Sequence, residues 1–274
     1  FGADDDYISL EDNGQANDNV SSIVPGLGAF SIDFVSPAVS LTLSTSDGDD
    51  WINLKAVDAG FGAVIDVLAG RGADHVTVEA NNLESYVWGG AGNDLLTGNA
   101  GSDVLVGDEG DDTLLGGGGS DELFGGADQD KLNGQGGDDV LVGNDGDDTL
   151  NGGSGSDWLS GDDGNDLVQG QGSSGDQLSG GPGDDTLDGG SGYDHVFETA
   201  DVDFTATDSS LTGLGTDTLV NIQLVQLFGG SSANTIDASA FSGRAFLNGL
   251  GGHDTLTGGP GFDRLFGGSG RDLI

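Results

Sequence analysis

Residues 89–197 repeat a nine-residue pattern, Gly-Gly-x-Gly-x-Asp-x-Leu-x, almost without interruption. Two clear copies are residues 89–97 and 180–188, and the whole segment comprises twelve nonapeptides and one inserted residue. A unit this short cannot bury a core of its own, so it must stack on its neighbours. The pattern therefore predicts a solenoid whose turns bury a common apolar stripe.

Position eight of the repeat is apolar in all twelve copies. Because side chains alternate along a strand, this residue should point inward from a short strand at positions seven to nine. Positions one to six are turn residues, since Gly permits positive φ and Asp or Asn bonds to the local backbone. Single strands of this length are unstable, so we expect parallel ladders. The expected core residues are Leu96, Leu105, Leu114, Leu123, Leu132, Leu141, Leu150, Leu159, Val168, Leu178, Leu187 and Val196.

Several copies depart from the pattern. Asp128 replaces Gly at position four, where Asp is tolerable because it can adopt the left-handed conformation. Asp108, Gln135 and Asn144 replace Gly at position two. The copy at 170–179 is one residue too long. We expect this insertion to bulge one loop without breaking the stack.

The regularity of the pattern divides the chain into four parts. Residues 1–88 carry degenerate repeats and are predicted to form irregular β-solenoid coils, and residues 89–197 form the regular core. Residues 198–248 are again irregular, and 249–274 resume the regular pattern but stop within a repeat. The chain also begins at Phe1 rather than Met. We expect it to be part of a longer polypeptide.

The chain is very acidic, with 48 Asp and Glu against 6 Lys and Arg and a formal charge of −42. Such a composition often indicates disorder, but disordered acidic tracts do not place an apolar residue at every ninth position. The charge argues against nucleic-acid binding, which needs basic residues. A compact fold needs the charge neutralised, by a polycationic partner or more economically by metal ions. With no Cys, disulfides and thiolate sites are excluded, and no apolar run approaches the roughly 20 residues of a membrane span.

The tandem pattern resembles the RTX (repeats-in-toxin) calcium-binding modules of secreted bacterial proteins, closely over 89–197, well over 249–274 and weakly elsewhere. The resemblance implies an all-β fold. It would be a right-handed parallel β-roll, or β-solenoid, with two nonapeptides per turn and irregular β-solenoid coils flanking the regular core. It also implies Ca²⁺ ions between successive loops, held by position-six carboxylates and backbone carbonyls.

Elementary chemistry agrees with a calcium site. Ca²⁺ takes six to eight oxygen ligands in flexible geometry, whereas Mg²⁺ prefers smaller octahedral sites. Glycine turns expose their carbonyls, and stacked turns bring aspartates 18 residues apart to about 4.8 Å, as for Asp94 with Asp112 and Asp103 with Asp121. Twelve such loops suggest on the order of ten ions. The predicted metal ligands are Asp94, Asp103, Asp112, Asp121, Asp130, Asp139, Asp148, Asp157, Asp166, Asp176, Asp185, Asp194, Asp254, Asp263 and Asp272.

Other motifs are better explained by the repeat. Asp50 and Asp74 lie in imperfect copies, where a local turn cap is the simpler interpretation. Residues 170–175 fit the dinucleotide pattern Gly-x-Gly-x-x-Gly but open no helix. The three histidines accompany no plausible nucleophile, so we expect no catalytic and no organic-cofactor residue. The tryptophans at 51, 88 and 158 are expected to fill coil ends or corners.

We therefore expect a non-enzymatic, calcium-dependent β-roll segment of a large secreted bacterial structural or surface protein, such as an adhesin, surface-layer or fibre-like protein. The resemblance implies type I secretion and an extracellular or cell-surface location. The expected partners are calcium ions, without nucleic acid or a membrane span, and either head-to-tail self-association or continuation into further repeats. The alternative is a folding and secretion module appended to a secreted enzyme or toxin whose catalytic domain lies outside this chain. Carbohydrate or ice binding on a flat face is less favoured, because position seven varies.

Overall fold

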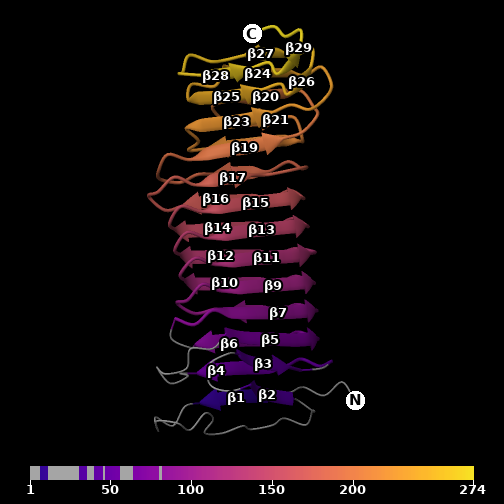
Figure 1. The fold of residues 1–274 in the computed structure, drawn as a ribbon, viewed down its shortest axis with the longest axis vertical. Coiled ribbons are helices and arrows are strands. Elements are labelled where there is room, and N and C mark those ends of the chain that lie inside the picture. The colour runs from indigo at the N-terminus through magenta and orange to yellow at the C-terminus, as the bar shows by residue number, and fades with distance from the viewer. Residues whose placement is uncertain (1–6, 12–30, 36–39, 46, 56–63, 80–81) are drawn as a thin grey trace. The chain divides into compact units, whose positions relative to one another are not determined.

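The structure is a computed structural model that describes residues 7–11, 31–35, 40–45, 47–55, 64–79 and 82–274. Every helix or strand in these residues is a β-strand (Figure 1), so the described chain contains no helix able to cross a membrane. The chain divides into two compact units, 1–145 and 146–274. Each unit consists of two β-sheets built from stacked turns, which confirms the predicted all-β parallel solenoid.

The first unit contains sheets A1 and B1. The strands of A1, in spatial order, are β1 (Tyr7–Glu11), β4 (Trp51–Lys55), β6 (His75–Glu79), β8 (Leu95–Thr97), β10 (Thr113–Gly118) and β12 (Lys131–Gly136). Those of B1 are β2 (Ser31–Val35), β3 (Ser40–Ser44), β5 (Val64–Arg71), β7 (Ser85–Ala91), β9 (Val104–Glu109), β11 (Glu122–Ala127) and β13 (Val140–Asp145). Consecutive repeats alternate between the two sheets. Strands β2 and β3 pair antiparallel, and β3 to β13 pair in parallel.

The second unit contains sheets A2 and B2. The strands of A2 are β14 (Thr149–Ser154), β16 (Leu167–Gln171), β18 (Thr186–Asp188), β22 (Thr216–Val220), β21 (Ser210–Thr212), β20 (Phe204–Thr207), β24 (Thr235–Ala240) and β27 (Thr255–Thr257). Those of B2 are β15 (Trp158–Asp163), β17 (Gln177–Ser179), β19 (His195–Thr199), β23 (Leu224–Phe228), β25 (Arg244–Asn248) and β28 (Arg264–Phe266). A further short pair joins β26 (Gly251–Gly252) to β29 (Ser269–Gly270).

The register confirms two nonapeptides per turn. Leu114 lies beside Leu132 in A1, and Leu123 lies beside Leu141 in B1. At the inserted residue, Asp157 and Asp176 occupy successive turns with a spacing of 19 rather than 18, and the 18-residue spacing then resumes. The extra residue is absorbed in the bend that precedes β17. The stack therefore continues through the insertion, as predicted.

The apolar stripe forms the core of both units. All twelve position-eight residues are at most 1% exposed, as predicted from their spacing. Position four of the loops requires glycine, because an ideal Cβ on Gly137, whose φ is +128°, would overlap the carbonyl oxygen of Gly119 in the preceding turn. Asp128 takes this position with φ 78°, which confirms its left-handed conformation. Asp108, Gln135 and Asn144 adopt positive φ at position two as well.

The irregular segment 198–248 stacks in the same direction but contains an insertion that the sequence did not indicate. Strand β21 pairs antiparallel with both β20 and β22, so a small meander interrupts sheet A2. Across it the spacing between stacked position-six residues grows to 32, from Asp185 to Asp217. Large aromatic side chains, Phe204 and Phe241, are buried here at 1% exposure. They fill space that a regular nonapeptide turn does not have.

The tryptophans do not fill corners, contrary to the sequence interpretation. Trp51 and Trp158 are 47% and 38% exposed, and Trp88 is partly exposed. Trp51 stacks on His75 of the next turn, with ring centroids 4.1 Å apart and planes 7° apart. Positions seven and nine point away from the inter-sheet space because position eight points into it. The aromatic rings therefore lie on the outer faces of the sheets.

Replacing Leu123 with Ala should lower the free energy of unfolding by about 2–5 kcal/mol, because the side chain is fully buried and the sheets cannot close over the cavity. Leu115→Ala, on the outer face of A1, is the matched control and should cost less than about 1 kcal/mol. Urea denaturation in the presence of calcium measures both. Equal losses would contradict the inward and outward assignment.

Candidate metal-binding loops

The position-six aspartates line up along the two edges of each solenoid unit. In the first unit, the backbone N–H of Asp94 donates to Oδ1 of Asp112 at 2.7 Å. On the other edge, Asp103 donates in the same way to Asp121 at 2.8 Å. Each carboxylate thus reaches back to the loop of the preceding turn. The structure brings together the pairs that an 18-residue turn places in contact.

The second unit repeats this arrangement. Asp166 donates to Oδ1 of Asp185 at 2.8 Å, and Asp176 donates to Asp194 at 2.9 Å. Four further predicted residues occupy these ladders and are at most 2% exposed: Asp130 and Asp139 in the first unit, and Asp148 and Asp157 in the second. Near the end of the chain, Asp254 is buried, whereas Asp263 and Asp272 are partly exposed. These last two accept N–H groups from Ala245 at 2.8 Å and Asp254 at 3.1 Å.

The second carboxylate oxygen is the unusual feature of these loops. While Oδ1 accepts the N–H of the preceding turn, Oδ2 is buried and accepts no hydrogen bond. A buried carboxylate oxygen without a partner is costly, so a cation or a proton must compensate it. The residues with such an Oδ2 include Asp94, Asp112, Asp121, Asp166, Asp176, Asp185, Asp194 and Asp254.

Each of these oxygens lies against the glycine at position one of its own loop, and the Oδ2 atoms of Asp94, Asp112 and Asp121 also lie beside a carbonyl of the neighbouring turn. A Cβ placed on Gly89 would overlap Oδ2 of Asp94 and lie 3.0 Å from the carbonyl oxygen of Gly107. A Cβ on Gly116 would lie 2.5 Å from Oδ2 of Asp121 and 3.0 Å from the carbonyl oxygen of Gly134. The two oxygens approach the same small space from successive turns. Glycine at position one keeps that space clear.

This donor set fits calcium. The ligands on offer are carboxylate and backbone carbonyl oxygens, which hard cations prefer, and Ca²⁺ accepts them in irregular geometry. Among the described residues, no three His, Cys, Asp or Glu side chains converge on one point that could hold a metal ion. Backbone carbonyls must therefore supply much of the coordination shell. The absence of Cys from the sequence removes the thiolate ligands that zinc often uses.

Burial raises the pKa of these carboxyls strongly. The pKa of Asp94 and of Asp121 rises to about 7, chiefly because burial disfavours the charged form and only partly because of neighbouring aspartates. Hydrogen bonds from the preceding turn oppose the shift without cancelling it. The pKa of Asp112 rises to about 6 for the same reason. Without a cation, the ladders hold carboxyls that take up protons near neutral pH.

The structure adds three carboxylates to the ladders. The sequence pattern predicts turn caps at Asp50 and Asp74 and does not single out Asp217. Asp50 donates its N–H to Oδ1 of Asp74, and Asp74 donates to Asp94, both at 2.7 Å, so the A1 ladder begins before the regular repeats. In the second unit, Asp217 accepts the N–H of Asp185 at 3.3 Å. Each of the three has an apolar residue two positions on, in a strand that directly follows Asp50 or Asp74 or that contains Asp217. This Asp-x-apolar signal persists although position one of these turns is not glycine.

Two neutral side chains continue the ladders in the irregular segment. Gln223 accepts the N–H of Asp194 through Oε1 at 2.6 Å. Asn234 donates its N–H to Asp254 at 2.9 Å, and its own Oδ1 accepts the N–H of Gly230 at 2.9 Å. The Gln223 amide satisfies the backbone of the adjacent turn, whereas the Asn234 amide satisfies its own loop. Neither side chain brings the negative charge of a position-six aspartate.

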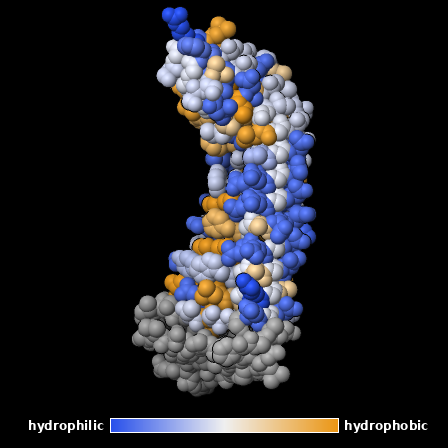
Figure 2. All heavy atoms as spheres, turned by 90° about the vertical axis from the view of Figure 1, so that its right-hand side faces the viewer, coloured by the Kyte–Doolittle hydropathy of each residue, from blue (hydrophilic) through white to orange (hydrophobic). Residues whose placement is uncertain are grey.

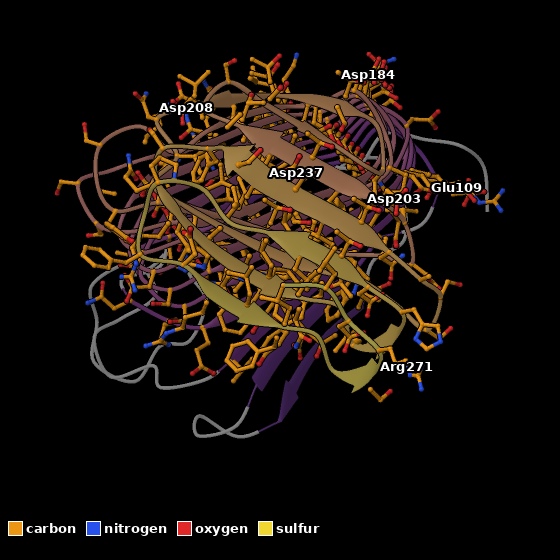
Figure 3. The ribbon with its side chains drawn as sticks, turned by 90° about the horizontal axis from the view of Figure 1, so that it is seen from above. Glu109, Asp184, Asp203, Asp208, Asp237 and Arg271 are labelled. Carbon is orange, nitrogen blue, oxygen red and sulfur yellow. The ribbon has the colours of Figure 1, made fainter. Side chains whose placement is uncertain are left out.

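A second, exposed ladder is formed by the residues at position five, several of them acids, which directly precede the position-six aspartates. The position-five side chain accepts an N–H from the following turn, the opposite direction to position six. Asn165 donates to Oδ1 of Asp147 at 2.8 Å, which lowers the pKa of Asp147, and Thr216 donates to Asp184 at 2.8 Å. Figure 3 shows Asp184 at the periphery of the stack. These acids cap loops at the surface.

Comparison with known proteins agrees with the geometry. The family model of the RTX calcium-binding nonapeptide repeat (four copies) matches residues 86–114, 106–141, 115–150, 133–168, 172–196 and 248–274. The chain belongs to this RTX repeat family. All fifteen predicted ligands lie within the matches, whereas Gln223 and Asn234 lie outside them. A search of the curated proteins found no match.

Gly107→Ala should weaken calcium binding by about 10-fold, because the new Cβ would overlap Oδ2 of Asp112 and displace it. Gly118→Ala is the matched control, since its Cβ would find its nearest neighbours at 3.8 and 3.9 Å and its φ is not positive. Calorimetric titration with calcium compares the two variants. An effect of equal size in both would rule out the Gly107 space as part of the site.

The calcium-free fold should become more stable as the pH falls from 8 to 5. The folded pKa values of Asp94, Asp121 and Asp166, about 7, lie above the ordinary value of 3.8. Groups whose pKa is raised by folding stabilise the fold fully below the unfolded pKa and lose this contribution as the pH rises through the folded value. Circular dichroism in chelator should therefore show more β-structure at pH 5 than at pH 8, where the calcium-free chain is expected to be a coil. Less β-structure at pH 5 would contradict these shifts.

Proposed function

We propose that this chain is a calcium-dependent folding module in which Ca²⁺ ions bind between successive loops. The observation that carries the proposal is the buried Oδ2 of loops such as those of Asp94, Asp112 and Asp121, which accepts no hydrogen bond and lies beside a glycine carbonyl of the next turn. The predicted aspartates of 94–194 and 254–272 supply the charge. Asp74 and Asp217 extend the same ladders and are added to the proposed ligands.

The proposed setting is outside the cell. RTX repeat proteins are typically secreted, and the charge of −42 suits export through a type I system. In a cytoplasm poor in calcium, repulsion between carboxylates and the conformational entropy of the glycines oppose folding. Outside, the free energy of calcium binding becomes free energy of folding. The chain would then fold only after export.

Within a secreted protein, we assign the chain a structural role, as a stiff segment of an adhesin, surface-layer or fibre-like protein. It is non-enzymatic in this proposal, because its repeated carboxylates are accounted for by loop caps and calcium ligands. Leu250, Phe266 and Leu273 near the last turn are 44%, 50% and 67% exposed. Further repeats, or a second copy in head-to-tail contact, would cover them.

Circular dichroism of the 274-residue chain tests the calcium dependence. In chelator at pH 8 the spectrum should be that of a coil, and millimolar calcium should produce β-structure, whereas equal magnesium should not. A β-rich spectrum that ignores calcium would overturn the proposal. A second experiment on one loop then tests the ligand assignment.

Asp112→Asn removes the charge of one buried ligand but keeps an Oδ1 that can accept the N–H of Asp94. It should raise the calcium concentration needed for folding and reduce the number of bound ions. Asp111→Asn is the matched control, because Asp111 is exposed and only caps the N–H of Gln129. Metal analysis after dialysis counts the ions. Identical stoichiometry and folding midpoints in the two variants would remove Asp112 from the ligand set.

A further inference from the structure

The outer face of sheet B1, here called the B1 face, carries one row of apolar side chains and a second row that, from β7 onward, is apolar except for Glu122. The register places position nine of successive B1 strands in one row and position seven in another. All of these side chains are at least partly exposed, and Leu68 is 44% exposed. The position-nine row is Leu68, Trp88, Val106, Phe124 and Val142, and the position-seven row from β7 onward is Tyr86, Val104, Glu122 and Val140.

The outer face of sheet A1 is different, although it is built from the same repeats. Its position-nine row from β6 onward reads Thr77, Thr97, Leu115 and Asn133, and its position-seven row reads His75, Leu95, Thr113 and Lys131. Polar side chains are the ordinary choice for a sheet face in water. The apolar residues therefore gather on one of the two outer faces. Contiguous exposed apolar surface of this kind marks an interaction site.

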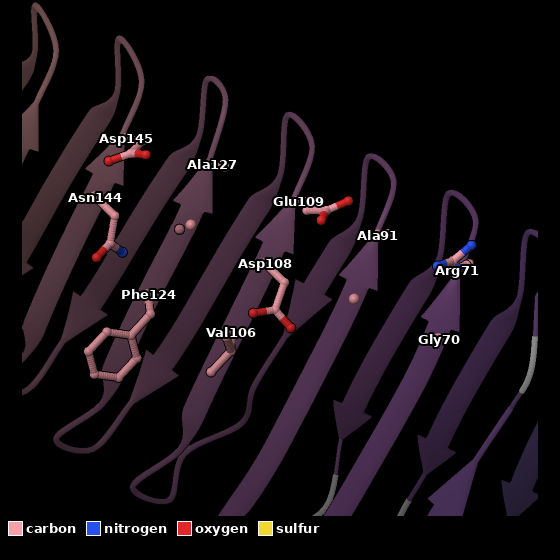
Figure 4. Close-up of a pocket in the computed structure, with 13 residues that line it drawn as sticks. Gly70, Arg71, Ala91, Val106, Asp108, Glu109, Phe124, Ala127, Asn144 and Asp145 are labelled. Atoms are coloured by element: carbon pink, nitrogen blue, oxygen red, sulfur yellow. The ribbon is translucent and has the colours of Figure 1, made fainter.

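The B1 face is hollowed where its rows meet the loops. A hollow of about 790 Å³ is lined by Val106 and Phe124, by three acids at the ends of strands β9 and β13, Asp108, Glu109 and Asp145, and by one basic residue, Arg71. Figure 4 shows Val106 and Phe124 on adjacent strands, with the carboxylates of Asp108, Glu109 and Asp145 along the strand ends. The three acids are exposed. The edge of the apolar rows on this side is thus predominantly negative.

Charge and dimensions together indicate what fits this surface. Figure 2 shows exposed hydrophobic side chains beside columns of hydrophilic ones. A second copy would bring the same charge of −42 against these acids, which opposes self-association through this face. A partner with basic residues beside an apolar stripe would be attracted. The row from Leu68 to Val142 spans four strand spacings, or about 19 Å, which equals about 13 residues of helix.

We propose that the B1 face docks a basic amphipathic helix of three to four turns, lying along the solenoid axis across β5, β7, β9, β11 and β13. Its apolar stripe would pack on the position-nine row, with an anchoring side chain in the hollow between Val106 and Phe124. Its Lys or Arg residues would lie over Asp108, Glu109 and Asp145. The interaction goes beyond the proposed calcium function and requires only that the module is folded.

The test uses a synthetic 14-residue peptide with Leu and Trp on one helical face and Lys on the other. A peptide of the same composition in scrambled order has equal charge but no stripe. Fluorescence anisotropy with the full chain in calcium and 150 mM salt (about an 8 Å Debye length) should show at least about 10-fold tighter binding of the amphipathic peptide. This difference separates helix docking from general attraction to an acidic protein.

Two double variants locate the site. Val106→Thr with Phe124→Thr should weaken binding of the amphipathic peptide at least about 10-fold, since Thr keeps the strand propensity and removes apolar contact. Leu95→Thr with Leu115→Thr, on the outer face of A1, should leave it unchanged. Circular dichroism in calcium confirms that each variant folds, so loss of the module itself is recognised separately.

Equal binding of the two peptides, or no effect of the Val106 and Phe124 changes in a folded variant, would overturn the proposal. Binding of neutral oligosaccharides to this face, without binding of the peptide, would also overturn it. If the chain folds without calcium, the calcium function fails, but the peptide experiment still decides the docking surface.

Discussion

Buried carboxylate oxygens in the loops are the constraint on which the structure depends. Turns such as those of Asp94, Asp112 and Asp121 place Oδ2 in a space where it accepts no hydrogen bond. The hydrophobic stripe of position-eight residues pulls the sheets together, and in doing so it forces these oxygens out of water. Proton uptake or a divalent cation must resolve the conflict. The raised pKa values of Asp94 and Asp121 reflect this burial of charge when no metal ion is bound.

The glycines and the aspartates of the loops share one closely packed space between successive turns. The loop backbones of successive turns approach so closely that position four tolerates almost only glycine, as at Gly137. Position one must also stay small, because the carboxylate and the neighbouring carbonyl occupy the space beside it. The outer positions three, five, seven and nine vary freely, and position two accepts Asp, Asn or Gln at positive φ. This explains how the chain can be highly repetitive inside while its outer faces differ.

Much of the fold and of the candidate site could be predicted from the sequence because both follow from a single period. The apolar residue at position eight predicts the core, and the Asp at position six predicts the ladders. The sequence predicts a turn cap at Asp74 and does not single out Asp217, because position one of their turns is not glycine, although the Asp-x-apolar pattern remains. The antiparallel strand β21 leaves no periodic signal. The apolar B1 face was not predicted, because successive repeats alternate between the two sheets. Position nine read along the chain therefore combines residues of both outer faces.

The direction of the position-six hydrogen bonds has a consequence for how the loops respond to their ions. The carboxylate of Asp112 accepts the backbone N–H of Asp94, and the backbone N–H of Asp112 donates to Asp130 in the following turn. Ordering of one loop therefore positions the ligand of the next loop. If Ca²⁺ occupies these loops as proposed, occupation of neighbouring sites would be coupled, and the response to rising calcium would be steeper than that of independent sites. Gln223 would interrupt this coupling, since its uncharged amide accepts a backbone N–H of the preceding turn in place of a carboxylate. Asn234 would interrupt it as well, since its amide oxygen accepts a backbone N–H in its own loop and brings no charge. The spacing of such uncharged positions would then set how many loops fold as one cooperative block.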